Sequence, residues 1–203
     1  MIACGMARVM LTMIALALLL GLAPAQAGEG PRLHATVQRT DRTYVDLRVG
    51  VLAAPGLAPE AMGQICGTVT PIRRLGIEAC GNGAGVLHNR GGADFAHFRL
   101  KATALEQRRG RTTWALNMGV GFAEVQRAAD APGFRFGPAD DGQVEAAGPE
   151  VAVGVSSRGR AGGSGHWIVD LTAGVAHIDG APIVMGVSDP VVPFVGLTMG
   201  AGF

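Results

Sequence analysis

The sequence predicts an all-β protein, an antiparallel up-and-down transmembrane β-barrel with eight strands, and three observations predict it. The chain opens with a secretory leader, continues in segments of roughly ten residues that alternate apolar and polar side chains, and ends on a phenylalanine within such a segment. The mean hydropathy is +0.30 and only 16% of the residues are charged. A water-soluble enzyme usually carries more surface charge, so the apolar side chains are expected to face something other than water.

Residues 1–27 have the three parts of a signal peptide. Arg8 precedes an apolar run over 9–23, and Ala-Gln-Ala at 25–27 is a small-residue cleavage site. The alternative, a membrane anchor, needs about 20 apolar residues and has no cleavage site. We therefore expect cleavage after residue 27, export into the periplasm, and one barrel domain over 28–203.

Charge and cysteine content agree with export. Loss of Arg8 with the leader leaves 16 basic and 16 acidic residues, so the mature chain is neutral and no nucleic-acid partner is expected. Cys66 and Cys80 remain, and an oxidising compartment favours a disulfide between them over two free thiols. Neither a cofactor nor a metal is expected, because the histidines have no metal-ligand spacing.

Period-two alternation defines the strands. Beyond the leader no apolar run reaches the length of a membrane helix, and a closed barrel is the other structure that satisfies every backbone hydrogen bond within a membrane. The expected strands are 44–52, 63–70, 74–80, 95–105, 114–122, 150–156, 166–175 and 194–203. A weakly alternating segment over 33–38 is interpreted as a lead-in or as an extension of the first strand.

The interval 54–92 leaves two interpretations open. It contains two further strands, or it is one loop closed by Cys66 and Cys80 around a six-strand core. Eight strands are preferred, because they place short turns on one side and long connections on the other, as expected of periplasmic turns and extracellular loops. The turns lie near 71–73, 107–112 and 157–165, and the long connections near 54–62, 81–93, 127–148 and 179–190.

The last strand, V-G-L-T-M-G-A-G-F, together with the leader, resembles the small outer-membrane β-barrel families of the OmpA and OmpX type. The resemblance implies a location in the bacterial outer membrane, with outer-membrane lipid and lipopolysaccharide as partners. It also implies that the C-terminal strand is the signal read by the barrel-assembly machinery. The residues assigned to this signal are Val195, Leu197, Met199, Ala201 and Phe203.

The inward face of an eight-stranded barrel is expected to be charged and filled, since such a barrel is just wide enough to hold its own side chains. The expected inward charges are Asp46, Arg48, Glu78, Arg99, Lys101, Glu150 and Asp170. Buried charges need partners, which favours an ion-pair network that plugs the lumen. The alternative is a narrow porin-like pore whose selectivity these charges set, and many inward glycines favour it by leaving room.

A structural or surface-interaction role is therefore predicted, covering envelope integrity, adhesion or a receptor surface. The longest unpatterned segment, 127–148, is expected to be exposed and to carry such a role. The oligomeric state is not indicated by the sequence.

Two other classes of protein fit less well. A lipid-modifying outer-membrane enzyme needs serine, histidine and acid together, but Ser156 and Ser157 lie at an expected turn and no histidine shares a strand face with a serine. A soluble exported barrel that binds an apolar ligand is opposed by the ending on Phe203 and by the glycine-rich alternate face. No enzyme activity is expected.

Overall fold

The computed structural model describes residues 44–72, 74–81, 94–127, 134–162 and 164–203. The predicted signal peptide at 1–27 and the alternating segment at 33–38 lie outside these residues. All described residues belong to one compact unit, Thr40–Phe203. Within them, no helix has the length and apolar character needed to span a bilayer.

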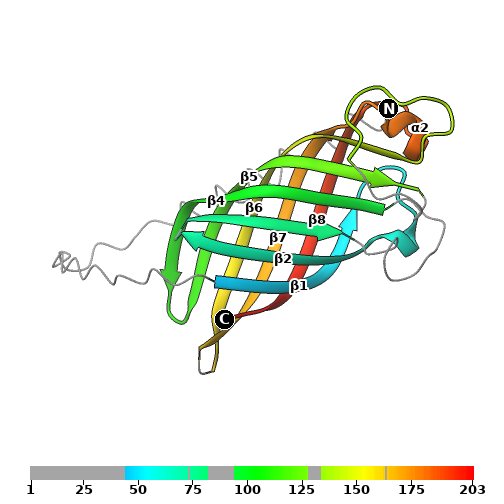
Figure 1. The fold of residues 1–203 in the computed structure, drawn as a ribbon. Helices are drawn as coiled ribbons and strands as arrows, with labels where there is room; N and C mark the ends of the chain where they lie inside the picture. Colours follow the sequence, from blue (N-terminus) through cyan, green and yellow to red (C-terminus); the bar gives the residue numbers. More distant parts are fainter. Residues whose placement is uncertain (1–43, 73, 82–93, 128–133, 163) are drawn as a thin grey trace, which may run out of the picture. The chain divides into compact units, whose positions relative to one another are not determined.

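The described chain forms a closed barrel in which every strand pairs antiparallel with its neighbours in sequence (Figure 1). The strands are β1 (Tyr44–Ala53), β2 (Gly63–Ile72), β3 (Leu75–Gly81), β4 (Asp94–Arg109), β5 (Thr112–Gln126), β6 (Glu145–Gly162), β7 (Gly165–His177) and β8 (Val191–Gly202). The backbone N–H groups of Val45 and Phe203 each donate to the other residue's carbonyl oxygen, at 3.1 Å, and so close the barrel between β1 and β8.

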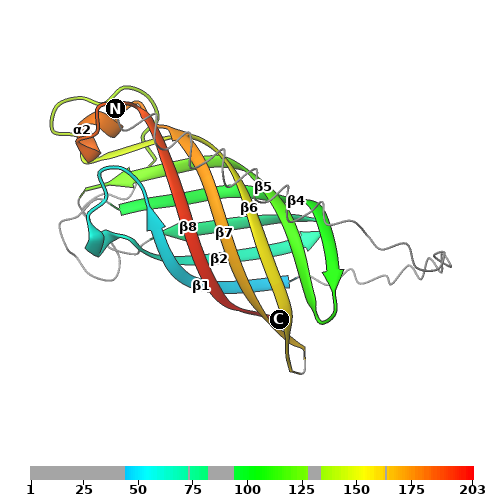
Figure 2. The ribbon, with the colours of Figure 1, turned by 180° about the vertical axis from the view of Figure 1, so that it is seen from behind.

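The eight-stranded antiparallel barrel predicted from the sequence is thus confirmed, and the six-strand alternative is wrong. β2 and β3 pair with each other, and they also pair with β1 and β4 respectively, so residues 63–72 and 75–81 are part of the wall. The paired strands extend further than the alternation predicted, so only a few residues separate β2 from β3, β4 from β5 and β6 from β7. From behind, β6, β7 and β8 cross the barrel side by side with a common tilt (Figure 2).

One predicted loop boundary is wrong. The sequence predicts an exposed connection over 127–148, but Glu145–Gly148 begin β6 and are buried. Their ladder with β5 runs to the pair Gln126 and Glu145. The sequence Glu-Ala-Ala-Gly-Pro lacks the β-branched and aromatic residues that mark a strand, so here the pairing with β5 overrides local preference.

The register of β4 shifts between Thr103 and Leu105, which is a bulge opposite β5. Beyond it Leu105 pairs with the outward Leu116 and is 67% exposed. The outward position predicted for residue 104 therefore passes to residue 105, because a bulge adds one residue and moves later side chains to the other face.

The longer connections lie at the opposite end of the barrel from the turns. They include the short 3-10 helix η1 (Pro59–Ala61) and the helix α2 (Ala181–Met185), which lies far from the C-terminus (Figure 1). We call this the loop end, and the end at which Gly110 joins β4 to β5 the turn end.

Candidate functional site: the filled lumen

The lumen contains all seven charged residues that the alternation places on the inward face. Each is at least nine-tenths buried except Lys101, whose side chain is 12% exposed. The seven are Asp46 and Arg48 on β1, Glu78 on β3, Arg99 and Lys101 on β4, Glu150 on β6, and Asp170 on β7. Six of them form one connected group, and Asp46 belongs to a second.

Glu78 is the centre of the larger group. Its carboxylate accepts hydrogen bonds from Arg48, from Arg99 Nε at 2.6 Å and from Lys101 Nζ at 3.1 Å. The hydroxyl of Thr68 lies 3.2 Å from the same carboxylate. Because Arg48 and Glu78 stand on β1 and β3, their side chains meet in front of the intervening strand β2.

Asp170 joins the group from the far wall. Lys101 Nζ donates to its Oδ2 at 2.7 Å, Arg48 Nη1 lies 3.5 Å from the same oxygen, and Thr172 donates to Oδ1 at 2.5 Å. The pair of Lys101 on β4 and Asp170 on β7 therefore links strands that are not neighbours in the wall.

Glu150 extends the group toward the loop end. His97 Nδ1 lies 2.5 Å from its Oε2, and Arg99 Nη1 lies 3.8 Å from its Oε1. Three cations, Arg48, Arg99 and Lys101, thus face the three carboxylates of Glu78, Glu150 and Asp170. Charges buried in this way are stable only when they are paired, and here each has an opposite charge at contact distance.

The second group surrounds Asp46 near the turn end. His166 Nε2 lies 2.5 Å from Asp46 Oδ1, and Arg158 Nη2 lies 3.8 Å from Oδ2. Arg158 was not among the predicted inward charges, because residues 157–165 were expected to form a turn. The signal was present in the alternation, since Arg158 continues the inward series of Glu150 by steps of two.

Several uncharged partners were also missed. Arg48 donates to the hydroxyls of Thr68 at 2.6 Å and Thr198 at 3.3 Å, and Asn117 Nδ2 donates to Ser156 Oγ at 2.9 Å. Ser156 was expected where a strand meets a turn, but it lies within β6, and its hydroxyl accepts a hydrogen bond from an amide. Among the described residues, no group of three or more histidine, cysteine or acidic side chains is arranged to hold a metal ion.

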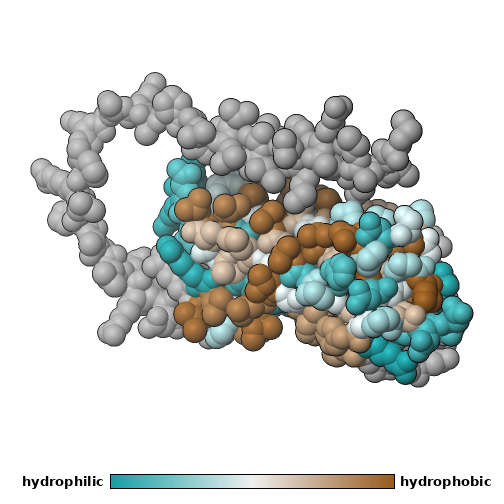
Figure 3. Space-filling model, turned by 90° about the horizontal axis from the view of Figure 1, so that it is seen from above, coloured by the Kyte–Doolittle hydropathy of each residue, from teal (hydrophilic) through white to brown (hydrophobic). Residues whose placement is uncertain are grey.

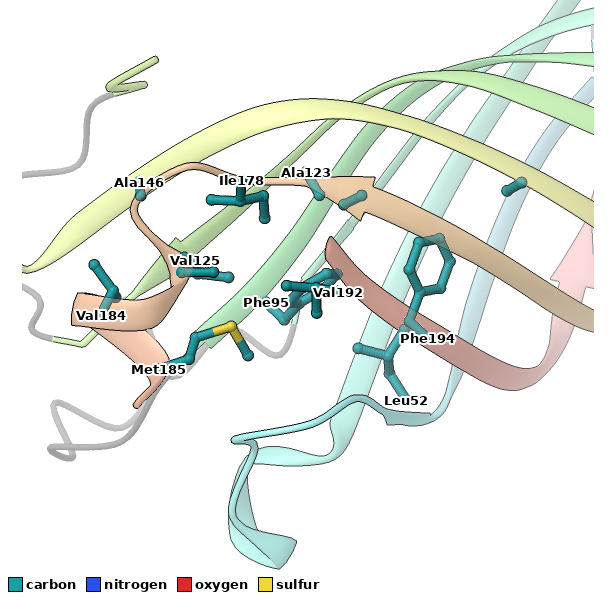
Figure 4. Packing of buried hydrophobic residues seen from close by; sticks show 13 residues of the cluster. Leu52, Phe95, Ala123, Val125, Ala146, Ile178, Val184, Met185, Val192 and Phe194 are labelled. Carbon is teal, nitrogen blue, oxygen red and sulfur yellow. The ribbon is translucent and has the colours of Figure 1, made fainter. Parts of the chain in front are cut away.

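An apolar cluster fills the loop end of the lumen (Figure 4). Phe95 on β4, Phe194 on β8 and Leu52 on β1 come from the loop ends of their strands and are at most 3% exposed. Val184 and Met185 of α2 pack into the same cluster, so this short helix is part of the filling. This helix was not predicted, since five residues cannot show a helical period.

The inward glycines do not leave the lumen open. A Cβ on Gly119 would lie 3.0 Å from Arg99 Cδ, and one on Gly174 would lie 2.3 Å from the ring of Phe194. A Cβ on Gly121 would lie 2.0 Å from the backbone oxygen of Phe98. The space that would favour a pore is therefore taken up by side chains and by the adjacent strand. The cavity beside Arg48 has room for about one water molecule.

Cys66 and Cys80 occupy directly paired positions on β2 and β3, and their sulfur atoms are bonded. Both face the lumen and are at most 5% exposed. The disulfide therefore lies in the barrel wall and does not close an external loop.

The C-terminal strand faces outward with the residues that the resemblance assigned to assembly. Leu197, Met199 and Phe203 are 49%, 62% and 74% exposed, and Val195 and Ala201 lie on the same face. Their partners on β1 include Val49 and Val51, which also face outward.

The chain matches no protein-family model, and no curated protein matches it in sequence. Two solved structures of Ail, the attachment invasion locus protein of Yersinia pestis, are similar to it. The first has 11% identity and a TM-score of 0.35, and the second, in complex with the heparin analogue sucrose octasulfate, has 10% identity and a TM-score of 0.36. Each alignment covers 80% of this chain and 99% of Ail. Similarity at this level transfers no function, and the fold is established here by the strand pairing.

Proposed function

We propose that this chain is an integral protein of the bacterial outer membrane, with a closed lumen and a structural or surface-interaction role. The observation that carries the proposal is the inverted polarity of the barrel, with charges inside and large apolar side chains exposed outside. Exposed outward residues occur on every strand: Leu47, Val49, Ile65, Val69, Ile77, Leu100, Met118, Val120, Val151, Val153, Leu171, Leu197 and Met199. Figure 3 shows apolar side chains over much of the visible face, with hydrophilic ones toward both of its ends.

The height of this apolar surface supports a membrane-spanning barrel. On β5 the outward residues run from Trp114 to Phe122, which is eight steps along the strand. At about 3.3 Å per residue and a tilt of about 40°, they cover roughly 20 Å of the barrel axis, close to the apolar band of about 25 Å in outer-membrane barrels. Trp114, Trp167 and Phe203 lie near the turn end of this surface, where interfacial aromatic residues are expected.

The filled lumen favours a role at the protein surface and argues against transport through the barrel. The inward charges neutralise one another at contact distance, and the apolar cluster covers them at the loop end. An ion crossing this lumen would have to break those pairs in a region of low dielectric constant, which is costly. The parts of the chain left to interact with other molecules are the exposed ones, including residues 140–142 of the connection between β5 and β6.

Fractionation of cells tests the location. The mature protein is expected in the detergent-soluble envelope fraction and to migrate faster on gels before heating than after. Release by osmotic shock would instead identify a soluble periplasmic barrel.

An arginine on the outer wall gives a second test of the location. Met118→Arg is expected to cost about 2–4 kcal/mol of unfolding free energy in vesicles. Gln107→Arg, on the exposed end of the same hairpin, is the control and is expected to have little effect.

Planar-bilayer recording tests the closed lumen. The purified barrel is expected to show no stepwise current. Stepwise currents that change with Arg99→Ala or Asp46→Ala would establish the pore and contradict the plug.

A further inference from the structure

Four phenylalanines form a cluster on the outer wall at the loop end. Ring centroids of Phe98 and Phe122 are 5.2 Å apart, and Phe134 lies 5.2 Å from the first and 4.9 Å from the second. Phe136 lies 5.6 Å from Phe122. Phe98 and Phe122 belong to β4 and β5, whereas Phe134 and Phe136 belong to the connection that follows β5. We call these four residues the rim cluster.

Backbone and charge contacts hold residues 134–136 against the start of β6. The N–H of Ala147 donates to the carbonyl oxygen of Arg135 at 2.6 Å, and Phe136 forms a parallel bridge with Ala147. The Nε of Arg135 lies 3.3 Å from the Glu145 carboxylate. These contacts fix the segment on the outside of the wall, since Ala147 pairs with the outward position 124 of β5.

The two loop phenylalanines remain half exposed although they touch the cluster. Phe134 is 50% exposed and Phe136 is 59% exposed. They continue the exposed apolar surface that ends on β5 with Val120 and Phe122. Beyond them Gly137 has a φ of 106°, which favours glycine, and the polar residues Asp140 and Asp141 that follow are exposed.

We propose that residues 134–136 insert into the lipid bilayer at the boundary nearest the loop end. They form a loop anchor, and the rim cluster is a lipid-contacting surface. The proposal rests on the membrane-spanning function proposed above and goes beyond it, because it assigns a connecting segment to the membrane. The occupant is the acyl-chain and headgroup boundary, since the surface is continuous with the apolar wall and aromatic residues flank the apolar band of outer-membrane barrels at both interfaces. The Arg135 side chain is 68% exposed beside the rings and can reach lipid phosphate.

Depth-dependent quenching of single tryptophans tests the anchor. In a background of Trp114→Phe and Trp167→Phe, a tryptophan is placed by Phe134→Trp or by Phe136→Trp. The folded variants, recognised by heat-modifiable migration, are reconstituted in phosphatidylcholine vesicles brominated near the headgroup or near the acyl-chain middle. Both probes are expected to lose fluorescence, more in the first vesicles than in the second, with a blue-shifted emission.

Two matched variants separate the outcomes. Met118→Trp, on the middle of the wall, is expected to be quenched most by the deep bromines, and Asp140→Trp, exposed in the same connection, is expected to be quenched by neither. If the tryptophans at 134 and 136 are not quenched, as expected for Asp140→Trp, while Met118→Trp is quenched, only the loop anchor is overturned. Absence of quenching at Met118→Trp would overturn the membrane-spanning proposal and the anchor with it.

A second measurement uses the native loop. A phospholipid with a photoactivatable diazirine close to its headgroup is expected to label the peptide that contains residues 134–136 of the unsubstituted protein. Labelling confined to strand peptides would contradict the anchor even if a tryptophan variant failed to fold.

Discussion

The two halves of the lumen are filled by opposite means. Toward the turn end, charged side chains from five strands pair with one another, and toward the loop end apolar side chains and α2 pack together. The halves meet at Arg99, whose guanidinium carbon lies 5.8 Å from the centre of the Phe194 ring, and at His97, whose ring lies 4.4 Å from the same phenylalanine.

The two halves differ in how the removal of a single side chain affects them. A buried ion pair fails when one partner is removed, because the other charge stays in a poorly solvated place. An apolar cluster loses only the contacts and volume of the atoms removed, and a loop can partly close the gap. The polar half should therefore be sensitive to single substitutions, and the apolar half more tolerant.

Removal of the shared carboxylate should have the largest effect. Glu78→Ala leaves Arg48, Arg99 and Lys101 competing for fewer acceptors, and we expect a loss of about 3–5 kcal/mol in the free energy of unfolding. Denaturant titration in vesicles, followed by heat-modifiable migration, measures it. Glu106→Ala, which removes an exposed carboxylate from β4, is the control, and equal stability of the two variants would contradict the network.

Loss of the disulfide should be the next largest effect, because it joins two strands that line the polar half. Cys66 and Cys80 are 14 residues apart, and a closed loop of that size contributes about 3 kcal/mol. Reduction of the unfolded protein should change its gel mobility, and Cys66→Ser should abolish the change. If a thiol reagent labels both cysteines before reduction, the disulfide is absent.

The sequence was sufficient to predict the strands because their signal is local. Each strand turns successive side chains to opposite faces, so alternation reveals both its position and its inward residues. The partners of those residues depend on barrel closure. Arg48 meets Glu78 across β2, and Lys101 meets Asp170 across the lumen, and neither pairing can be read from spacing. The alternation therefore predicts which charged residues face the lumen, but not which of them pair with one another.

The apolar half was less predictable for the same reason. Ile178 and Val184 lie in a connection with no alternation, and their burial depends on the opening left by the strand ends. The rim cluster likewise joins residues on two strands to a loop that turns back, so its members are brought together only by the folded chain.

Substitution of a wall glycine should give an intermediate effect and tests how closely the wall surrounds the polar half. Gly121→Ala would place its Cβ 2.0 Å from the Phe98 oxygen, so the strands must shift, at a cost of about 1–3 kcal/mol. Gly67→Ala, where nothing lies within 4 Å, is the matched strand control. Equal stabilities would mean that the wall has room at position 121.

The smallest effect is expected in the apolar half. Val184→Ala removes two carbons from a fully buried side chain, and at about 0.8 kcal/mol per buried methylene we expect a loss of roughly 1–2 kcal/mol. Val191→Ala, at a position 45% exposed, controls for the change in residue type. The same denaturant titration measures both. A loss at Val184 as large as that of Glu78→Ala would contradict the comparison, because the apolar half would then be as sensitive to a single substitution as the polar half.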